Sequence, residues 1–155
     1  MFKADWPAPF HIKTAISTRE GGVSLPPYDG LNLGSHVYDT PEAVAQNRQL
    51  FRRQAKMPAE PLWLNQVHGT ACVVLEQTDF SVGPFTADAS TTKTKGLVSV
   101  VLTADCLPVL FCDAAGTQVA AAHAGWRGLV DGVLEQTLAQ FSDPTTVMAW
   151  LGPAI

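Results

Sequence analysis

The clearest regular pattern of hydrophobic and polar positions lies in the first third of the chain. Thr40-Pro41-Glu42 has the form of a helix start, an N-cap threonine followed by proline at the first helical position. Side chains suited to one helix face then recur at helical spacing and stop before Pro58; they are Val44, Asn47, Leu50, Phe51 and Ala55. This spacing predicts a helix over residues 41–56. The Gly- and Pro-rich stretch over residues 21–34 predicts a long loop.

Short apolar runs follow from residue 62 onward. They predict strands over residues 62–67, 72–76, 97–103, 108–112, 118–122 and 147–151. The run Leu97-Val-Ser-Val-Val-Leu102 is nearly all apolar, which is typical of a central strand covered on both faces. Helical spacing returns over residues 128–141, through Val130, Val133, Leu134, Leu138 and Phe141. The pattern therefore predicts an α/β fold, with α+β as the alternative.

Composition and charge narrow the class of protein. A chain of 155 residues with 46% hydrophobic and 15% charged residues predicts one domain, residues 1–155, with a substantial core. A formal net charge of -4 and scattered Lys and Arg argue against a nucleic-acid partner. The sequence shows no signal-peptide pattern and no apolar run of about 18 residues, so we predict a cytoplasmic protein without a membrane partner. Three cysteines, an odd number, predict reduced thiols.

Three short segments carry the candidate chemistry. His68, Cys106 and His123 each lie among small or turn-forming residues, at or near the end of a predicted strand. Strand ends can converge on one edge of a sheet, and a His, Cys and His set suits a transition metal with one position left open for water or substrate. Each histidine has an ordinary hydrogen-bonded role as its alternative. Cys106 has the alternative of a buried inert thiol, which is our interpretation of Cys72 and Cys112.

Four charged residues are further candidates. Arg19 and Arg127 lie in glycine-containing loops where a guanidinium and bare backbone N–H groups suit a phosphate, although either can be an ordinary surface arginine. Asp88 and Asp105 can orient a liganding histidine or act as acid or base, with a turn or capping role as the alternative. We assign Arg19, Asp88 and Arg127 to substrate binding, and Asp105, with the three candidate ligands, to catalysis. We interpret Trp126 as a packing anchor.

Seven motifs, distributed along the chain in order, resemble the bacterial YfiH family. Members of this family are also labelled laccase-domain or polyphenol oxidase proteins. The motifs are Ser17-Thr-Arg19-Glu-Gly-Gly-Val-Ser24, Leu31-Asn-Leu33, Asn65-Gln-Val-His68-Gly69, Ala87-Asp88-Ala89, Thr103-Ala-Asp-Cys106-Leu-Pro-Val, His123-Ala-Gly-Trp-Arg-Gly128 and Leu151-Gly-Pro-Ala-Ile155.

The resemblance implies a layered α/β fold with mixed sheets and flanking helices, and a zinc site whose ligands are His68, Cys106 and His123. It also implies phosphorolysis of adenosine, inosine, guanosine and methylthioadenosine, together with deamination of adenosine, so the expected partners are a small nucleoside and phosphate. The family typically continues past the Gly-Pro-Ala-Ile segment that ends this chain. We therefore expect the C-terminal part of the family to be lacking here.

Three other functions use the same residues. Two histidines and a cysteine also suit a type 1 copper site, as in a laccase-like polyphenol oxidoreductase, but the four histidines of this chain are too few for a trinuclear copper cluster. A metal-free hydrolase would use Cys106 as nucleophile, with His68 or His123 as its base. A structural zinc module is less favoured, since structural sites usually close with four protein ligands. The leading hypothesis is a zinc-dependent enzyme of purine nucleosides.

Overall fold

The computed structural model describes residues 1–155, apart from the side chain of Gln77. Contacts within the chain divide it into two compact units. One consists of residues 1–4 and 13–57 and is named the helix unit; the other consists of residues 5–12 and 58–155 and is named the sheet unit. The single domain expected over residues 1–155 stays a prediction.

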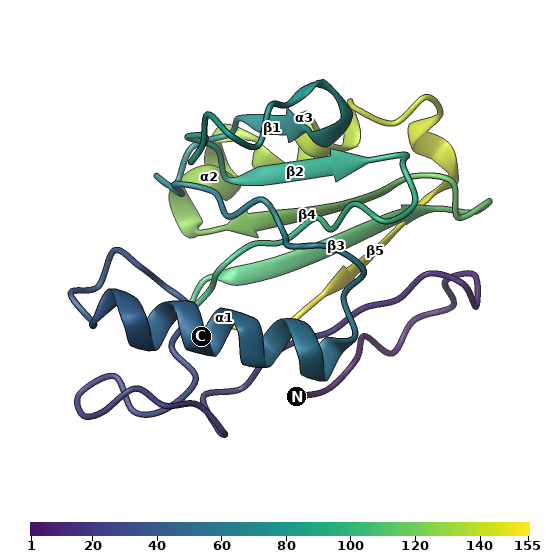
Figure 1. The fold of residues 1–155 in the computed structure, drawn as a ribbon. Coiled ribbons are helices and arrows are strands. Elements are labelled where there is room, and N and C mark those ends of the chain that lie inside the picture. Colours follow the sequence, from purple (N-terminus) through teal and green to yellow (C-terminus); the bar gives the residue numbers. More distant parts are fainter. The chain divides into compact units, whose positions relative to one another are not determined.

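The helix unit contains one long helix, α1 (Pro41–Ala55), and an irregular chain (Figure 1). The helix begins as the sequence predicts, because the Thr40 side chain accepts a hydrogen bond from the Ala43 N–H and Pro41 occupies the first turn. It ends at Lys56, whose left-handed backbone lets its N–H reach carbonyls of the last turn. The predicted helix over 41–56 is confirmed.

Asn47 fixes the irregular chain of the helix unit. The residue is completely buried on α1. Its Oδ1 accepts from the Val23 N–H at 2.8 Å, and its Nδ2 donates to the Ser24 hydroxyl and to the carbonyls of Gly30 and Asn32. One buried amide thus supplies hydrogen-bond partners to backbone groups of the loop, which in a sheet would bond to a neighbouring strand. The expected loop over residues 21–34 contains no helix or strand and is confirmed.

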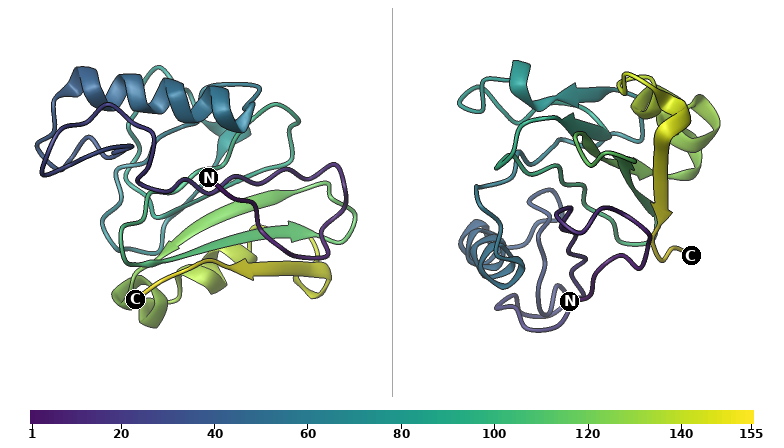
Figure 2. Two further views of the ribbon diagram at one scale, coloured as in Figure 1. Left: turned by 90° about the horizontal axis from the view of Figure 1, so that it is seen from below. Right: turned by 90° about the vertical axis from the view of Figure 1, so that its right-hand side faces the viewer.

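The sheet unit is built on one mixed sheet of five strands in the order β1-β2-β4-β3-β5 (Figure 1). Its strands are β1 (Cys72–Val74), β2 (Ala89–Thr92), β3 (Leu107–Asp113), β4 (Val119–Ala124) and β5 (Val147–Leu151). β1 runs parallel to β2, and the other neighbours are antiparallel. Two short helices, α2 (Trp126–Asp131) and α3 (Val133–Leu138), contact the sheet, α3 across β2 and β4 (Figure 2). The α/β fold with a mixed sheet is confirmed.

Alternation along β4 sets the two faces of the sheet. Ala120, Ala122 and Ala124 belong to a core cluster that includes Val133 and Phe141. Successive side chains of a strand point to opposite faces, so His123 points to the other face of the sheet. A second cluster consists of Leu62, Leu64, Leu75 and Ala87, of which Leu75 begins the 3-10 turn after β1.

Two predicted strands are wrong. Residues 62–67 form only an isolated bridge between Asn65 and Thr86, although Leu62 and Leu64 are buried. Residues 97–103 form no strand and are half-buried or exposed. Their apolar pattern reflects packing against the second cluster through Leu97 rather than a ladder of backbone hydrogen bonds. Conversely, β2 was not predicted, because its Ala-Ser-Thr-Thr sequence is small and polar although all four residues are buried.

The other elements differ from the prediction mainly in their ends. The predicted strand over 72–76 ends at Val74 and continues as the 3-10 turn Leu75–Gln77. The strands expected over 108–112, 118–122 and 147–151 are confirmed as β3, β4 and β5. The helix predicted over 128–141 is two helices, since Gly132 adopts a left-handed φ of 96° that separates α2 from α3. In the described part of the chain, no helix is long and apolar enough to span a bilayer.

Candidate metal centre

His68, Cys106 and His123 meet at one edge of the sheet. His123 is the last residue but one of β4, Cys106 immediately precedes β3, and His68 lies in the loop before β1. One ligand atom from each residue lies within 4.8 Å of the others, and within the described residues this is the one such cluster. The Cys106 sulfur is 3.8 Å from the His68 Nε2 atom. The strand ends therefore bring the three side chains together as expected, and their role as metal ligands stays a prediction.

The three side chains differ in their exposure. His123 is buried, with 4% of its surface exposed, Cys106 is half-buried and His68 is exposed. The rings of the two histidines meet edge to face, with their centroids 4.8 Å apart. The site is therefore anchored in the sheet at His123 and reaches solvent at His68. A ligand can approach from the His68 side.

Asp88 joins two of the three candidate ligands. Its carboxylate is completely buried. Oδ1 lies 2.8 Å from the His123 Nδ1 atom and accepts from the His68 N–H at 2.9 Å, and Oδ2 accepts from the N–H groups of Val67 and Gly69. Because a carboxylate can only accept, the His123 Nδ1 atom is the donor to Asp88, and the His123 Nε2 atom is the ring nitrogen that can serve as a metal ligand.

The same carboxylate explains the backbone of His68. This residue has a left-handed φ of 59°, which is uncommon for a residue with a Cβ atom. Three consecutive N–H groups, of Val67, His68 and Gly69, all point at Asp88 in this conformation. The buried negative charge therefore stabilises the turn that presents His68.

Asp105 and the two arginines lie in different surroundings. Asp105 is exposed beside Cys106. Burial is the largest cause that raises the pKa of the Cys106 thiol, and the charge and the hydrogen bond of Asp105 raise it further. The exposed Arg127 guanidinium stacks over the Trp126 ring, 4.7 Å from its centroid. Arg19 belongs to the helix unit, where its guanidinium donates to the Asp29 carbonyl and faces the Asp29 carboxylate at 3.5 Å.

The exposure of Trp126 and the burial of Cys72 and Cys112 test two predictions made from the sequence. Trp126 is 69% exposed, so the packing anchor expected there is wrong; the ring stacks on Arg127 instead. Cys72 and Cys112 lie in β1 and β3, and burial raises the pKa of each thiol to about 11, as expected for inert thiols.

Gly125 has no side chain, and the side chains of His68 and Cys106 occupy the space beside it. A Cβ atom at this position would lie 2.6 Å from the His68 Cδ2 atom and 3.0 Å from the Cys106 sulfur. The φ of Gly125 is -62°, which any residue adopts, so the glycine is required by the neighbouring side chains and not by the backbone. Sequence reasoning did not assign this role, although Gly125 lies inside the His123-Ala-Gly-Trp motif.

Replacing Gly125 by alanine is expected to separate His68 from Cys106 and to weaken the affinity of this cluster for added zinc at least about tenfold, equivalent to about 1.4 kcal/mol. Titration with zinc against a chelator measures the change. Gly96→Ala is the control: Gly96 has a φ of 94° with open space around it, so alanine there strains the backbone without touching the cluster. Equal zinc affinity in both variants would contradict the role assigned to Gly125.

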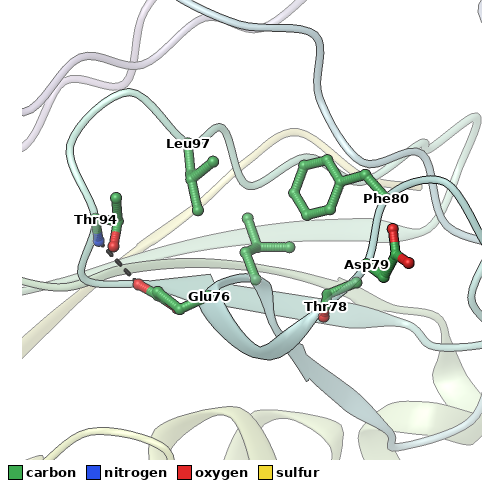
Figure 3. A pocket seen from close by; sticks show the side chains of 7 residues that line it. Glu76, Thr78, Asp79, Phe80, Thr94 and Leu97 are labelled. Carbon is green, nitrogen blue, oxygen red and sulfur yellow. Dashed lines mark hydrogen bonds between the residues drawn. The ribbon is translucent and has the colours of Figure 1, made fainter.

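A surface pocket of the sheet unit lies apart from this centre. It has a volume of about 450 Å³, and its lining includes Glu76 and Thr94 (Figure 3). These residues follow the C-terminal ends of β1 and β2, whereas Asp88 precedes the N-terminal end of β2. Burial raises the pKa of the Glu76 carboxyl there, but hydrogen bonds from the Thr92 hydroxyl and from the N–H groups of Lys93 and Thr94 outweigh it and hold the pKa at about 2. Glu76 therefore stabilises the turn after β2 through these hydrogen bonds.

Comparison with known proteins places the chain in a family. The family model described as "Multi-copper polyphenol oxidoreductase laccase" matches residues 13–155. The chain is 55% identical, over 97% of its length and 61% of the relative, to the Escherichia coli protein named purine nucleoside phosphorylase YfiH. It is 48% identical, over the same shares, to a Haemophilus influenzae protein named purine nucleoside phosphorylase.

Solved structures agree with the sequence comparisons. A crystal structure of a Neisseria meningitidis protein superposes with a TM-score of 0.92 and 53% identity, over 99% of this chain and 62% of that protein. The chain thus spans about three fifths of the length of the curated relatives that it matches. The chain belongs to the laccase-like polyphenol oxidoreductase family, which is the family of the YfiH proteins.

Proposed function

We propose that His68, Cys106 and His123 bind one zinc ion and that this centre serves the phosphorolysis of purine nucleosides. The observation that carries the proposal is the convergence of the three ligand atoms within 4.8 Å, from segments far apart in the sequence. The names of the relatives supply the reaction, since several are called purine nucleoside phosphorylase.

The donor set fits a zinc ion with an open position. Ligand atoms about 2.0 to 2.3 Å from one ion lie closer together than 4.8 Å, so the loops would contract slightly on binding. Asp88 already gives His123 the tautomer that such binding needs. Three protein ligands are typical of catalytic rather than structural zinc sites. A bound zinc ion would supply a Lewis acid at the reacting centre.

The charged candidate residues have separate proposed roles. Arg127, and Arg19 of the helix unit, carry the guanidinium groups that suit phosphate. Asp105 is exposed next to Cys106 and is our candidate for proton transfer at the departing base. Asp88 was assigned to substrate binding, but its burial and its four protein partners support an orienting role instead.

Deamination of adenosine is a second proposed reaction of the same centre. The feature in its favour is the solvent-exposed side of the cluster at His68, where a water molecule and an adenine ring have access to the open position. In this reaction the Asp105 carboxylate would take a proton from the attacking water and pass it to the departing amine.

Two alternatives fit the structure less well. A type 1 copper site usually adds a distant methionine, but Met148, the methionine of the sheet unit, pairs with Cys112 toward the other end of β3. A metal-free Cys-His hydrolase needs a thiolate near neutral pH, whereas burial and the Asp105 charge raise the pKa of Cys106.

Metal content and product analysis test the proposal. The purified chain is expected to hold close to one zinc ion, and inosine with phosphate is expected to yield hypoxanthine and ribose 1-phosphate, separated by chromatography. Adenosine without phosphate is expected to yield inosine. The Escherichia coli relative, assayed in parallel, serves as the positive control. Oxidation of phenols without added copper, in place of nucleoside turnover, would contradict the proposal.

A further inference from the structure

The side chain of Gln66 binds both backbone groups of one distant residue. Its Nε2 atom donates to the Leu102 carbonyl at 2.7 Å, and its Oε1 atom accepts from the Leu102 N–H at 2.7 Å. The two residues are 36 positions apart, and Gln66 is half-buried. This pair of hydrogen bonds has the pattern of a β-bridge in which one side is a side chain.

The pairing matters because of where the two residues lie. Gln66 is two residues before His68, and Leu102 is four residues before Cys106. The segment 97–103 lacks the strand ladder expected of it, and side chains hold it instead, through Gln66 at Leu102 and through Ser99 at Ser90. Gln66 is thus a direct connection between the loop of His68 and the segment that leads to Cys106.

We propose that Gln66 is a positioning residue of the metal centre, which sets the distance between His68 and Cys106; this inference rests on the proposed zinc site. Asp88 ties the His68 loop to His123, and Gln66 ties the same loop to the Cys106 segment. The loop of His68 is therefore the central member of a hydrogen-bonded series that links all three ligands.

The physical consequence concerns the free energy of ordering the site. With the Gln66 pair in place, the 3.8 Å approach of the Cys106 sulfur to His68 exists before any metal arrives. Without it, the Leu102 N–H and carbonyl turn to water, and the metal must order the Cys106 segment as it binds. Loss of such supporting hydrogen bonds typically weakens metal binding about 10- to 100-fold.

Gln66→Met tests the proposal, because methionine keeps the length and apolar stem of the side chain but makes neither hydrogen bond. The matched control is Gln118→Met. Gln118 is a buried glutamine of the same unit whose Nε2 atom donates to the Thr91 hydroxyl and the Gln140 carbonyl. Zinc affinity is measured by chelator competition, and cobalt absorption reports the bond to the Cys106 sulfur. Exchange of the Leu102 amide hydrogen is measured by NMR in the metal-free chain.

The expected result is a loss of zinc affinity of about 10- to 100-fold in Gln66→Met, with a weaker cobalt–sulfur band and faster Leu102 exchange. Gln118→Met is expected to lower the melting temperature without changing zinc affinity. Zinc affinity in Gln66→Met within twofold of the parent chain, or unchanged Leu102 exchange, would overturn the inference. So would an equal loss of affinity in Gln118→Met, which would indicate general destabilisation. A parent chain that binds zinc while Gln66→Met binds it equally well refutes this inference alone, whereas a parent chain without metal refutes the proposed zinc site as well.

Discussion

Cys106→Ala is expected to reduce bound zinc from close to one ion per chain to below about one tenth, and to abolish nucleoside turnover with it. In the proposed zinc site, removing one of three protein ligands leaves two histidines, and the loss of affinity should exceed the roughly 10- to 100-fold effect of changing a supporting residue. The fold should survive, because Cys106 is half-buried in a loop before β3 and alanine removes one sulfur atom. Elemental analysis and chromatography of nucleoside products measure the two effects.

The matched control is Cys72→Ala. Cys72 is also half-buried, but it lies in β1 and packs against the first core cluster. We expect this variant to keep its zinc and to lose about 1 kcal/mol of stability. If Cys106→Ala retained a full complement of zinc, Cys106 would not be a ligand. Full activity of a metal-free preparation would favour the Cys-His hydrolase.

Asp88→Asn is expected to have the largest effect on stability. The carboxylate receives four hydrogen bonds, two at each oxygen, and an amide of the same shape presents an NH₂ group to two donors whichever way it turns. Each buried donor left without a partner costs about 1–3 kcal/mol, so we expect a loss of about 2–6 kcal/mol in the free energy of unfolding. Zinc affinity should fall about 10- to 100-fold as the His123 tautomer and the His68 turn lose their support. Urea unfolding and chelator competition measure the two quantities.

Asp113→Asn provides the comparison. Asp113 also accepts backbone N–H groups, from Thr117 and Gln118, but it lies at the opposite end of β3 and is half-buried. A smaller loss of stability and unchanged zinc affinity are expected there. An Asp88→Asn chain as stable as its parent would show that the carboxylate does not organise the turn.

Local sequence determined the elements whose signals are local. The Thr40 cap, Pro41 and the helical stripe through Val44 and Phe51 specify α1 without help from the rest of the chain. β3, β4 and β5 were equally predictable, since each is an apolar run bounded by turn residues. The residue types His68, Cys106 and His123, among small neighbours, also identified the candidate ligands before any geometry was known.

Tertiary contacts decided the elements that the hydrophobic pattern predicted wrongly, namely β2 and the segment 97–103. β2 is small and polar in sequence, yet it is completely covered, because β1 and β4 pair with its two edges and its serine and threonine hydroxyls find partners. The segment 97–103 is apolar in sequence, yet side chains of Gln66 and Ser90 hold it where a strand was expected. Apolar runs report burial, and only the positions of neighbouring strands decide whether the buried backbone joins a ladder.

The candidate metal centre also has a part that local sequence predicts and a part that only the tertiary structure decides. Its chemical groups are visible in the sequence, because histidine and cysteine beside glycine are recognisable from local pattern alone. Their supports are less visible: the pattern left Asp88 open between orienting a histidine, acid or base chemistry and a turn role, and it indicated no role for Gln66 or Gly125. The supports act across 20 to 57 positions of the chain, Asp88 on His68, Gln66 on Leu102 and Gly125 on His68. Hydrogen bonds and excluded volume between such distant residues depend on strand order and register, which local sequence does not encode.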